Sequence, residues 1–146
     1  MDLDQFFPYR LAVLAEQVSL ATAQVYASRF ALGRYEWRVL AALANEGDVR
    51  PADLKERTTL EKMQVSRALA RLEQDGLVTR SPDPEDGRAW RVRLLPAGMA
   101  LYRKVVPMVQ AREEYLLADL TPEEQAVLAR AIEKVEARAR QLNRQG

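Results

Sequence analysis

The sequence predicts a mainly α-helical protein that contains a single two-stranded β-hairpin. Apolar residues recur at helical spacing along most of the chain, for example at Leu11, Leu14 and Val18. Between residues 77 and 94 the period changes to the alternation that is typical of strands. A polar stretch rich in Pro, Asp and Gly, SPDPEDG at 81–87, separates these strands and indicates a hairpin turn.

The composition excludes several kinds of chemistry. The 146 residues include neither cysteine nor histidine, which rules out disulfides, thiolate nucleophiles, Cys/His zinc sites and the commonest general base. No paired-acid motif or glycine-rich phosphate loop is present, so we expect no enzyme activity, no cofactor and no metal. No apolar run is long enough to span a bilayer, and Asp2 and Asp4 stand where a signal peptide carries basic residues. We therefore expect a soluble, cytoplasmic protein without a membrane partner.

The first half of the chain predicts four helices. Residues 8–30 carry one apolar face, and further apolar residues lie around the same helix, which favours burial on more than one side and thus a second subunit. Residues 34–45 and 51–57 predict two shorter helices. A fourth is predicted over 61–75, with a T-x-x-E capping box from Thr58 to Glu61 at its start.

The second half predicts the hairpin and two long helices. Leu77–Arg80 and Ala89–Leu94 are expected to be its strands. Helical periodicity resumes at Pro96, and Pro107 is expected to kink or divide that helix. Thr121 and Pro122 predict the start of the last helix. Its apolar stripe consists of Leu128, Ala131, Ile132, Val135, Ala139 and Leu142.

This order of elements predicts a winged helix-turn-helix. Residues 34–94 form the expected DNA-binding lobe, in which three helices precede a hairpin wing. A lobe of this kind does not need the helices at 8–30 and 96–142, which suit dimerisation between two copies. Residues 1–146 are therefore expected to form one functional unit.

The helix at 61–75 is the expected recognition helix. Val65, Leu69 and Leu72 share one face, which would dock on the lobe. The residues expected to face DNA are Lys62, Met63, Gln64, Ser66, Arg67 and Arg71. Arginine can bond two guanine acceptors in the major groove, and glutamine can do the same with adenine. The alternative is an ordinary solvated face.

The stretch ADLKERTTLEKMQVSRALARLEQDGLVTRSPDPEDGRAWRVRLLPAG resembles the DNA-binding core of the MarR family of transcription factors. The V-S-R of the recognition helix, the D-G-L-V-x-R before the wing and the D-x-R at its tip carry the resemblance. EWRVLAAL and LTPEEQAVL extend it over residues 8–142. Leu95 departs from the pattern, because the family usually has threonine or serine there.

The resemblance assigns roles to the wing tip. It implies that Arg88 enters the minor groove, whose negative potential favours a guanidinium, and that Asp86 holds this arginine in place. Asp83 and Glu85 are expected to weaken DNA binding somewhat. A salt bridge between Asp86 and Arg88 is an alternative that is compatible with both roles.

The resemblance also implies a homodimer whose affinity for DNA falls when a small aromatic carboxylate or phenol binds. Arg10, beside Tyr9, is the candidate carboxylate ligand, with Tyr26, Arg34 and Trp37 as weaker candidates. The alternatives are an inter-subunit salt bridge from Arg10 to a C-terminal glutamate and a core position for Trp37.

We therefore expect a ligand-responsive regulator, usually a repressor, that binds a pseudo-palindromic operator in double-stranded DNA. The alternative function is a winged-helix interaction module that does not bind specific DNA sequences. The net charge is only +1, so DNA binding has to depend on where individual arginines are placed.

Overall fold

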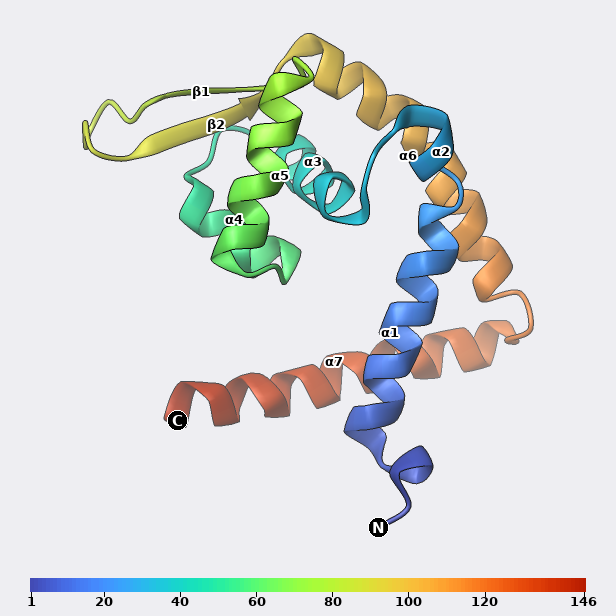
Figure 1. The fold of residues 1–146 in the computed structure, drawn as a ribbon. Helices are drawn as coiled ribbons and strands as arrows, with labels where there is room; N and C mark the ends of the chain where they lie inside the picture. The colour runs from blue at the N-terminus through green and yellow to red at the C-terminus, as the bar shows by residue number, and fades with distance from the viewer. The chain divides into compact units, whose positions relative to one another are not determined.

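The computed structural model describes residues 1–146 as a helical chain with one β-hairpin (Figure 1). Its elements are η1 (Leu3–Gln5), α1 (Phe7–Ala23), α2 (Ala27–Phe30), α3 (Arg34–Glu46), α4 (Pro51–Thr58), α5 (Lys62–Gln74), β1 (Val78–Pro82), β2 (Trp90–Leu94), α6 (Pro96–Leu116) and α7 (Pro122–Gln145). They form two compact units, Met1–Arg112 and Glu113–Gly146. The predicted fold class is confirmed. None of the helices combines the length and the apolarity needed to cross a membrane.

The core of the first unit lies between α3, α4, α5 and the hairpin. Its buried apolar residues are Ala23, Tyr26, Leu32, Val39, Leu40, Leu43, Leu54, Leu60, Val65, Ala68, Leu69, Leu72, Val78, Val92 and Val105. The recognition helix α5 contributes Val65, Leu69 and Leu72, the three residues that the helical spacing predicts. Its orientation is therefore fixed by a continuous apolar contact, and its remaining faces point outward.

The hairpin pairs antiparallel strands in the register Val78↔Leu94 to Pro82↔Trp90. It projects beyond the helices of the lobe (Figure 1). Val49, in the loop between α3 and α4, adds a bridge to Val92 through two backbone hydrogen bonds of 3.0 and 2.7 Å. The wing therefore has a third, very short strand at its root.

The first long helix ends earlier than its periodicity predicts. α1 stops at Ala23, and α2 is a separate turn at Ala27–Phe30, so the expected continuous helix over 8–30 is wrong. The chain turns here because Tyr26, only 2% exposed, enters the core and stacks on Trp37 at 5.5 Å between ring centroids. No glycine or proline marks the break.

The predicted capping box at Thr58 is also wrong. Thr58 is the last residue of α4, where its hydroxyl donates to the carbonyl of Leu54. The following helix is capped instead by Glu61, whose backbone N–H donates to the Gln64 side chain at 2.9 Å. The cap has shifted because Thr59 adopts a left-handed conformation, with φ of 61°, that ends α4 and separates the two helices.

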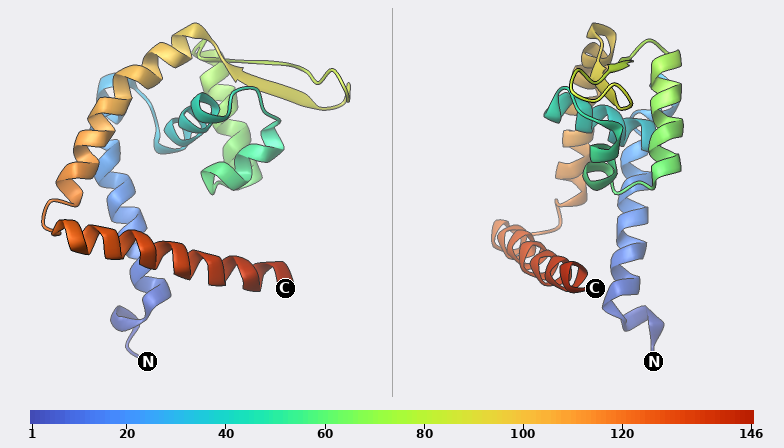
Figure 2. Two further views of the ribbon diagram at one scale, coloured as in Figure 1. Left: turned by 180° about the vertical axis from the view of Figure 1, so that it is seen from behind. Right: turned by 90° about the vertical axis from the view of Figure 1, so that its left-hand side faces the viewer.

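Of the two effects expected of Pro107, a kink or a division, the structure excludes the division. Pro107 lies inside α6, and the helix curves along its length (Figure 2). Leu95, which departs from the family pattern, donates its N–H to the carbonyl of Leu77 at 2.9 Å. This bond ties the start of α6 to the residue before β1 without a hydroxyl cap.

Gly98 allows this close approach of α6, because a methyl group built there would collide with the carbonyl oxygen of Leu77. We expect Gly98→Ala to lower the free energy of unfolding by about 1–3 kcal/mol, the usual cost of overpacking, despite the higher helix propensity of alanine. Urea denaturation measures this change. Gly87→Ala is the control, because nothing lies within 4 Å of its added methyl group. Equal stabilities of the two variants would contradict the steric role.

Candidate nucleic-acid interface

The outward face of α5 is polar and exposed. Lys62, Met63, Ser66, Arg67 and Arg71 are all exposed, and Met63 is 60% exposed. Arg71 forms an ion pair with Asp75 one turn later, at 3.4 Å, whereas Arg67 forms none. Arg67 is therefore the arginine of this helix that is available for another partner.

Gln64 lies at the edge of this face, where it is half-buried. Its side-chain oxygen already accepts the N–H of Glu61 in the cap of α5. The amide nitrogen forms no hydrogen bond in the structure. Gln64 thus has a local structural role that its spacing does not reveal, beside the DNA contact expected of it.

At the wing tip, Asp86 and Arg88 interact through the backbone of the arginine. The N–H of Arg88 donates to Asp86 Oδ1 at 3.0 Å, and no ion pair joins the two side chains. The aspartate therefore shapes the turn and leaves the guanidinium of Arg88 exposed at the tip.

Asp83 has a different environment from the one expected. It is 4% exposed, and its carboxylate accepts Arg50 Nε at 2.8 Å and the N–H of Glu85 at 2.8 Å. Arg91 Nε lies 4.0 Å away. The N–H of Glu85 and the Arg50 guanidinium hold the pKa of Asp83 below its ordinary value. The charge of Asp83 is therefore paired inside the wing, and its expected effect on DNA binding stays a prediction.

Asp83 is part of a set that we call the wing anchor: Asp48, Arg50, Asp83 and Arg91. Arg91 also pairs with Asp48 at 3.6 Å, on the same loop as Arg50. Arg50 occupies the N-cap position of α4 but makes no capping bond, because a guanidinium has only donors. Arg50 was not among the predicted site residues. Arginine is an unfavourable N-cap residue, and its presence at the start of α4 could have indicated another role.

A second connection joins the wing to α5. Arg80 on β1 donates two hydrogen bonds to Glu73, at 3.0 and 3.3 Å, and its guanidinium lies 5.9 Å from the ring centroid of Trp90. The Arg80 bond lowers the pKa of Glu73. Trp90 remains 50% exposed. These two hairpin residues were not predicted as site residues, because their pairing depends on the strand register and on the fold of α5.

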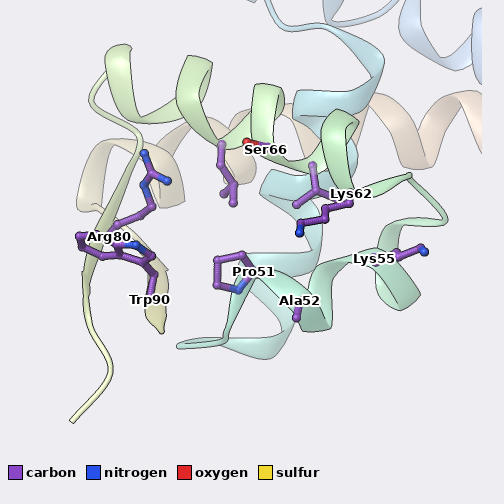
Figure 3. A pocket seen from close by; sticks show the side chains of 9 residues that line it. Pro51, Ala52, Lys55, Lys62, Ser66, Arg80 and Trp90 are labelled. Atoms are coloured by element: carbon purple, nitrogen blue, oxygen red, sulfur yellow. The ribbon is translucent and has the colours of Figure 1, made fainter. Parts of the chain in front are cut away.

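A cavity of about 440 Å³ lies between α4, α5 and the hairpin. Its lining consists of Pro51, Ala52, Lys55, Lys62, Val65, Ser66, Leu69, Arg80 and Trp90. Figure 3 shows Arg80 and Trp90 together on the hairpin side, facing Pro51 and Ala52 of α4. Of the three cations around this cavity, Lys55 pairs with Glu61 at 3.8 Å and Arg80 with Glu73 at 3.0 Å, so Lys62 is the unpaired one.

The four candidate effector residues fall into two separate groups. Tyr26 and Trp37 belong to an aromatic stack that continues from Trp37 to Tyr102 at 5.9 Å. Burial raises the pKa of Tyr26. Tyr9 and Arg10 are exposed in the first turn of α1, and the helical rise places Arg10 about 20 Å from the end of that helix. Within one chain these residues do not surround one small ligand.

Arg34, the remaining weak candidate, binds residues of α1. It donates to Glu16 at 2.9 Å and to the Ser19 hydroxyl at 3.2 Å, and Arg38 donates to the same hydroxyl at 3.1 Å. This cluster holds α1 against α3. Trp37 also borders an open groove of about 500 Å³ between α3, α4 and α6.

Comparisons with known proteins agree with this geometry. A family model described as MarR family matches residues 32–89. The homoprotocatechuate degradative operon repressor of Escherichia coli is 25% identical over 120 residues, covering 82% of this chain and 81% of the repressor.

Two solved structures are also similar. One is a mutant of E. coli MarR complexed with operator DNA: it is 26% identical, the match covers 92% of this chain and 98% of that one, and the TM-score is 0.77. The other is the PcaV regulator of Streptomyces coelicolor in complex with its natural ligand, with 25% identity, coverage of 95% and 97%, and a TM-score of 0.81.

Proposed function

The chain belongs to the MarR family of winged helix-turn-helix transcriptional regulators, and from this premise we propose that it acts as a homodimeric repressor. In this proposal it binds a pseudo-palindromic operator and leaves the DNA when a small aromatic acid binds. The relative named above is a repressor, and the similar MarR structure contains operator DNA. The finer assignments below depend on individual residues of this chain.

One observation carries the DNA-binding proposal: the distribution of free and paired arginines. Arg67 on α5 and Arg88 at the wing tip form no ion pair, whereas Arg50, Arg71 and Arg80 are each bound to a carboxylate. A free, exposed guanidinium on a docked helix can make a bidentate contact with a guanine. Arg93 on β2 is also exposed and unpaired, but Arg67 and Arg88 are the two that lie where a winged helix meets DNA, on the recognition helix and at the wing tip.

The groove assignments follow from shape and charge. The α5 helix has the dimensions to enter the major groove, and its docking face leaves Ser66 and Arg67 outward. A hairpin tip is narrow, and the negative potential of a narrow minor groove favours an inserted guanidinium such as that of Arg88. Lys62, which is exposed and forms no ion pair, supports a contact with a phosphate.

Unpartnered apolar faces support the homodimer. On α1, Leu11 and Leu14 are 48% and 58% exposed, and on α7, Ile132 and Leu142 are 56% and 68% exposed. Such a density of exposed apolar residues marks an interaction surface. A second copy is the natural partner, since a two-fold dimer matches a two-fold operator with half-sites roughly 34 Å apart.

The effector proposal depends on Arg10. It forms no ion pair in the structure, and it lies among the exposed apolar residues of α1, a surface that dimerisation would bury. A cation buried there needs an anionic partner, and a carboxylate fits the guanidinium fork. Arg10 lies far from the Tyr26–Trp37 stack in its own chain, so we propose that the ligand binds near the dimer interface.

Arg67→Ala is expected to weaken binding to the operator by about 1–3 kcal/mol and to relax discrimination at one base position per half-site. The operator is first selected from random duplexes with the wild-type protein, and fluorescence anisotropy then measures affinity. Arg57→Ala is the matched control, because Arg57 is paired with Glu46 on the side of α4 toward α3.

Arg88→Ala should weaken binding more on AT-rich flanks than on GC-rich flanks. An equal loss for Arg67→Ala on operator and unrelated DNA would contradict base readout. Failure of the wild-type protein to select any duplex would favour the alternative function, an interaction module.

Ile132→Asp is expected to break the dimer, because it places a charge in the apolar face of α7. Light scattering should give twice the chain mass of 16.6 kDa for the wild-type protein and monomers or aggregates for the variant. Ala137→Asp is the control, since residue 137 lies on the opposite side of the same helix. A well-folded Ile132→Asp dimer would show that α7 is not the interface.

A small aromatic carboxylate is expected to lower operator affinity by roughly 5–150-fold, the range of typical coupling energies. Calorimetry with benzoate, salicylate, hydroxybenzoates and pyridine-carboxylates tests this. Arg10→Ala should abolish binding of the acid that the wild-type protein binds, and Arg10→Lys should weaken it, because lysine lacks the bidentate fork. An acid bound equally by the wild-type protein and Arg10→Ala would remove Arg10 from the site.

A further inference from the structure

The loop before α4 is joined to the wing at three successive residues. Asp48 pairs with Arg91 at 3.6 Å, Val49 exchanges two backbone hydrogen bonds with Val92, and Arg50 pairs with the buried Asp83 at 2.8 Å. The next residue, Pro51, begins α4. The wing is therefore connected directly to the helix that precedes the recognition helix.

Asp83 is the centre of this connection. Among the Asp, Glu, Lys and Arg side chains, it is the one that is buried, at 4% exposure. Its carboxylate bonds Arg50 and the N–H of Glu85, while its own N–H donates to the carbonyl of Ala89 at 2.9 Å. One residue thus closes the turn of the hairpin and ties the hairpin to the loop before α4.

We propose that Asp83 is a positioning residue for DNA binding, which holds the wing at the angle that brings Arg88 to the minor groove while α5 lies in the major groove. The inference rests on the proposed function, since it concerns how DNA is bound. It gives the wing anchor a role in affinity although Asp83 itself carries the same sign of charge as DNA.

The geometry of a hairpin explains why its root matters. Arg88, at the tip, is four positions before Val92, where Val49 bridges the hairpin, a distance of about 13 Å in an extended strand. A tilt of roughly 20° at the root would move the tip by about 4–5 Å, and the minor groove is only about 6 Å wide. A wing without its anchor would therefore often miss the groove.

The proposal reverses the expectation from simple electrostatics. An acid near DNA weakens binding by repulsion, so removing its charge should tighten the complex. This expectation holds for Glu85, which is exposed and forms no ion pair. For Asp83 we expect the opposite change in affinity. Removing its charge should weaken the complex with DNA, because it releases Arg50 and frees the wing.

Operator affinity of Asp83→Asn and Glu85→Gln, measured by anisotropy at one salt concentration, tests the proposal. Asparagine keeps an acceptor for the N–H of Glu85, but it has a donor NH2 group in place of Oδ2 and carries no charge, so both the hydrogen bond and the ion pair with Arg50 are lost. Asp83→Asn should bind operator with AT-rich flanks about fivefold more weakly or worse, up to the loss caused by Arg88→Ala, whereas Glu85→Gln should bind equally or more tightly. In the Arg88→Ala background, Asp83→Asn should cost nothing further, because both changes act through one contact.

Thermal melts and amide exchange at Asp83 and Ala89 establish that each variant is folded and that the wing is loosened. If Asp83→Asn does not fold, Arg50→Gln replaces it, since the Arg50 side chain is 42% exposed. Tighter or unchanged binding by the folded variant, or an additive loss with Arg88→Ala, overturns the positioning role. A wild-type protein that selects no DNA overturns the proposed function itself, and this inference with it.

Discussion

The packing of α5 against α3 is the interaction on which the lobe depends. Val65, Leu69 and Leu72 are almost fully buried against a core that includes Val39 and Leu40. A helix held along such a stripe cannot rotate without exposing that apolar area, which would cost roughly 25 cal/mol for each Å². The exposed positions of Ser66 and Arg67 are therefore a consequence of burial on the opposite side. Hydrophobic contact with the core determines the orientation of α5, and this orientation determines which polar residues are exposed.

Electrostatics then distinguishes two groups among the arginines around the wing and α5. Arg50, Arg80 and Arg91 bind carboxylates and fix the hairpin to the loop before α4 and to α5. Arg67, Arg88 and Arg93 bind none and remain exposed. A net charge of +1 gives the whole chain little attraction for a polyanion. Placement of the free guanidiniums consequently matters more than their number. The paired arginines contribute indirectly, because they hold the free ones in position.

The apolar residues of α1 and α7, outside the lobe, differ from those of α5 in their exposure. On α1 and α7 they keep helical spacing but have large exposed fractions in the single chain. Two long helices with unburied apolar faces favour association, and the charged residue Arg10 lies within one of these faces. The same surface thus supports both the proposed dimer and the proposed ligand site. This arrangement offers a physical route by which a ligand at the interface can change the separation of two recognition helices.

The sequence by itself determined the order of the elements, the buried face of α5 and the position of the hairpin, because each depends on local periodicity or turn chemistry. The candidate residues Arg67 and Arg88 also followed from local position and from the resemblance that V-S-R and D-x-R carry. Local patterns in the sequence misplaced the cap of α5 and the end of α1, where Thr59 adopts a left-handed conformation and Tyr26 enters the core.

Only the tertiary structure decided the environment of Asp83. In the sequence it is one of three acids in a polar loop, and no local signal distinguishes it from Glu85. Its partner Arg50 stands 33 residues earlier, at a position where an arginine serves no local purpose. The pairing of Arg80 with Glu73 and the separation of Arg10 from Tyr26 likewise depend on how helices and strands pack. Contacts between distant residues arise from the fold as a whole, so no pattern within a short stretch of the chain could reveal them.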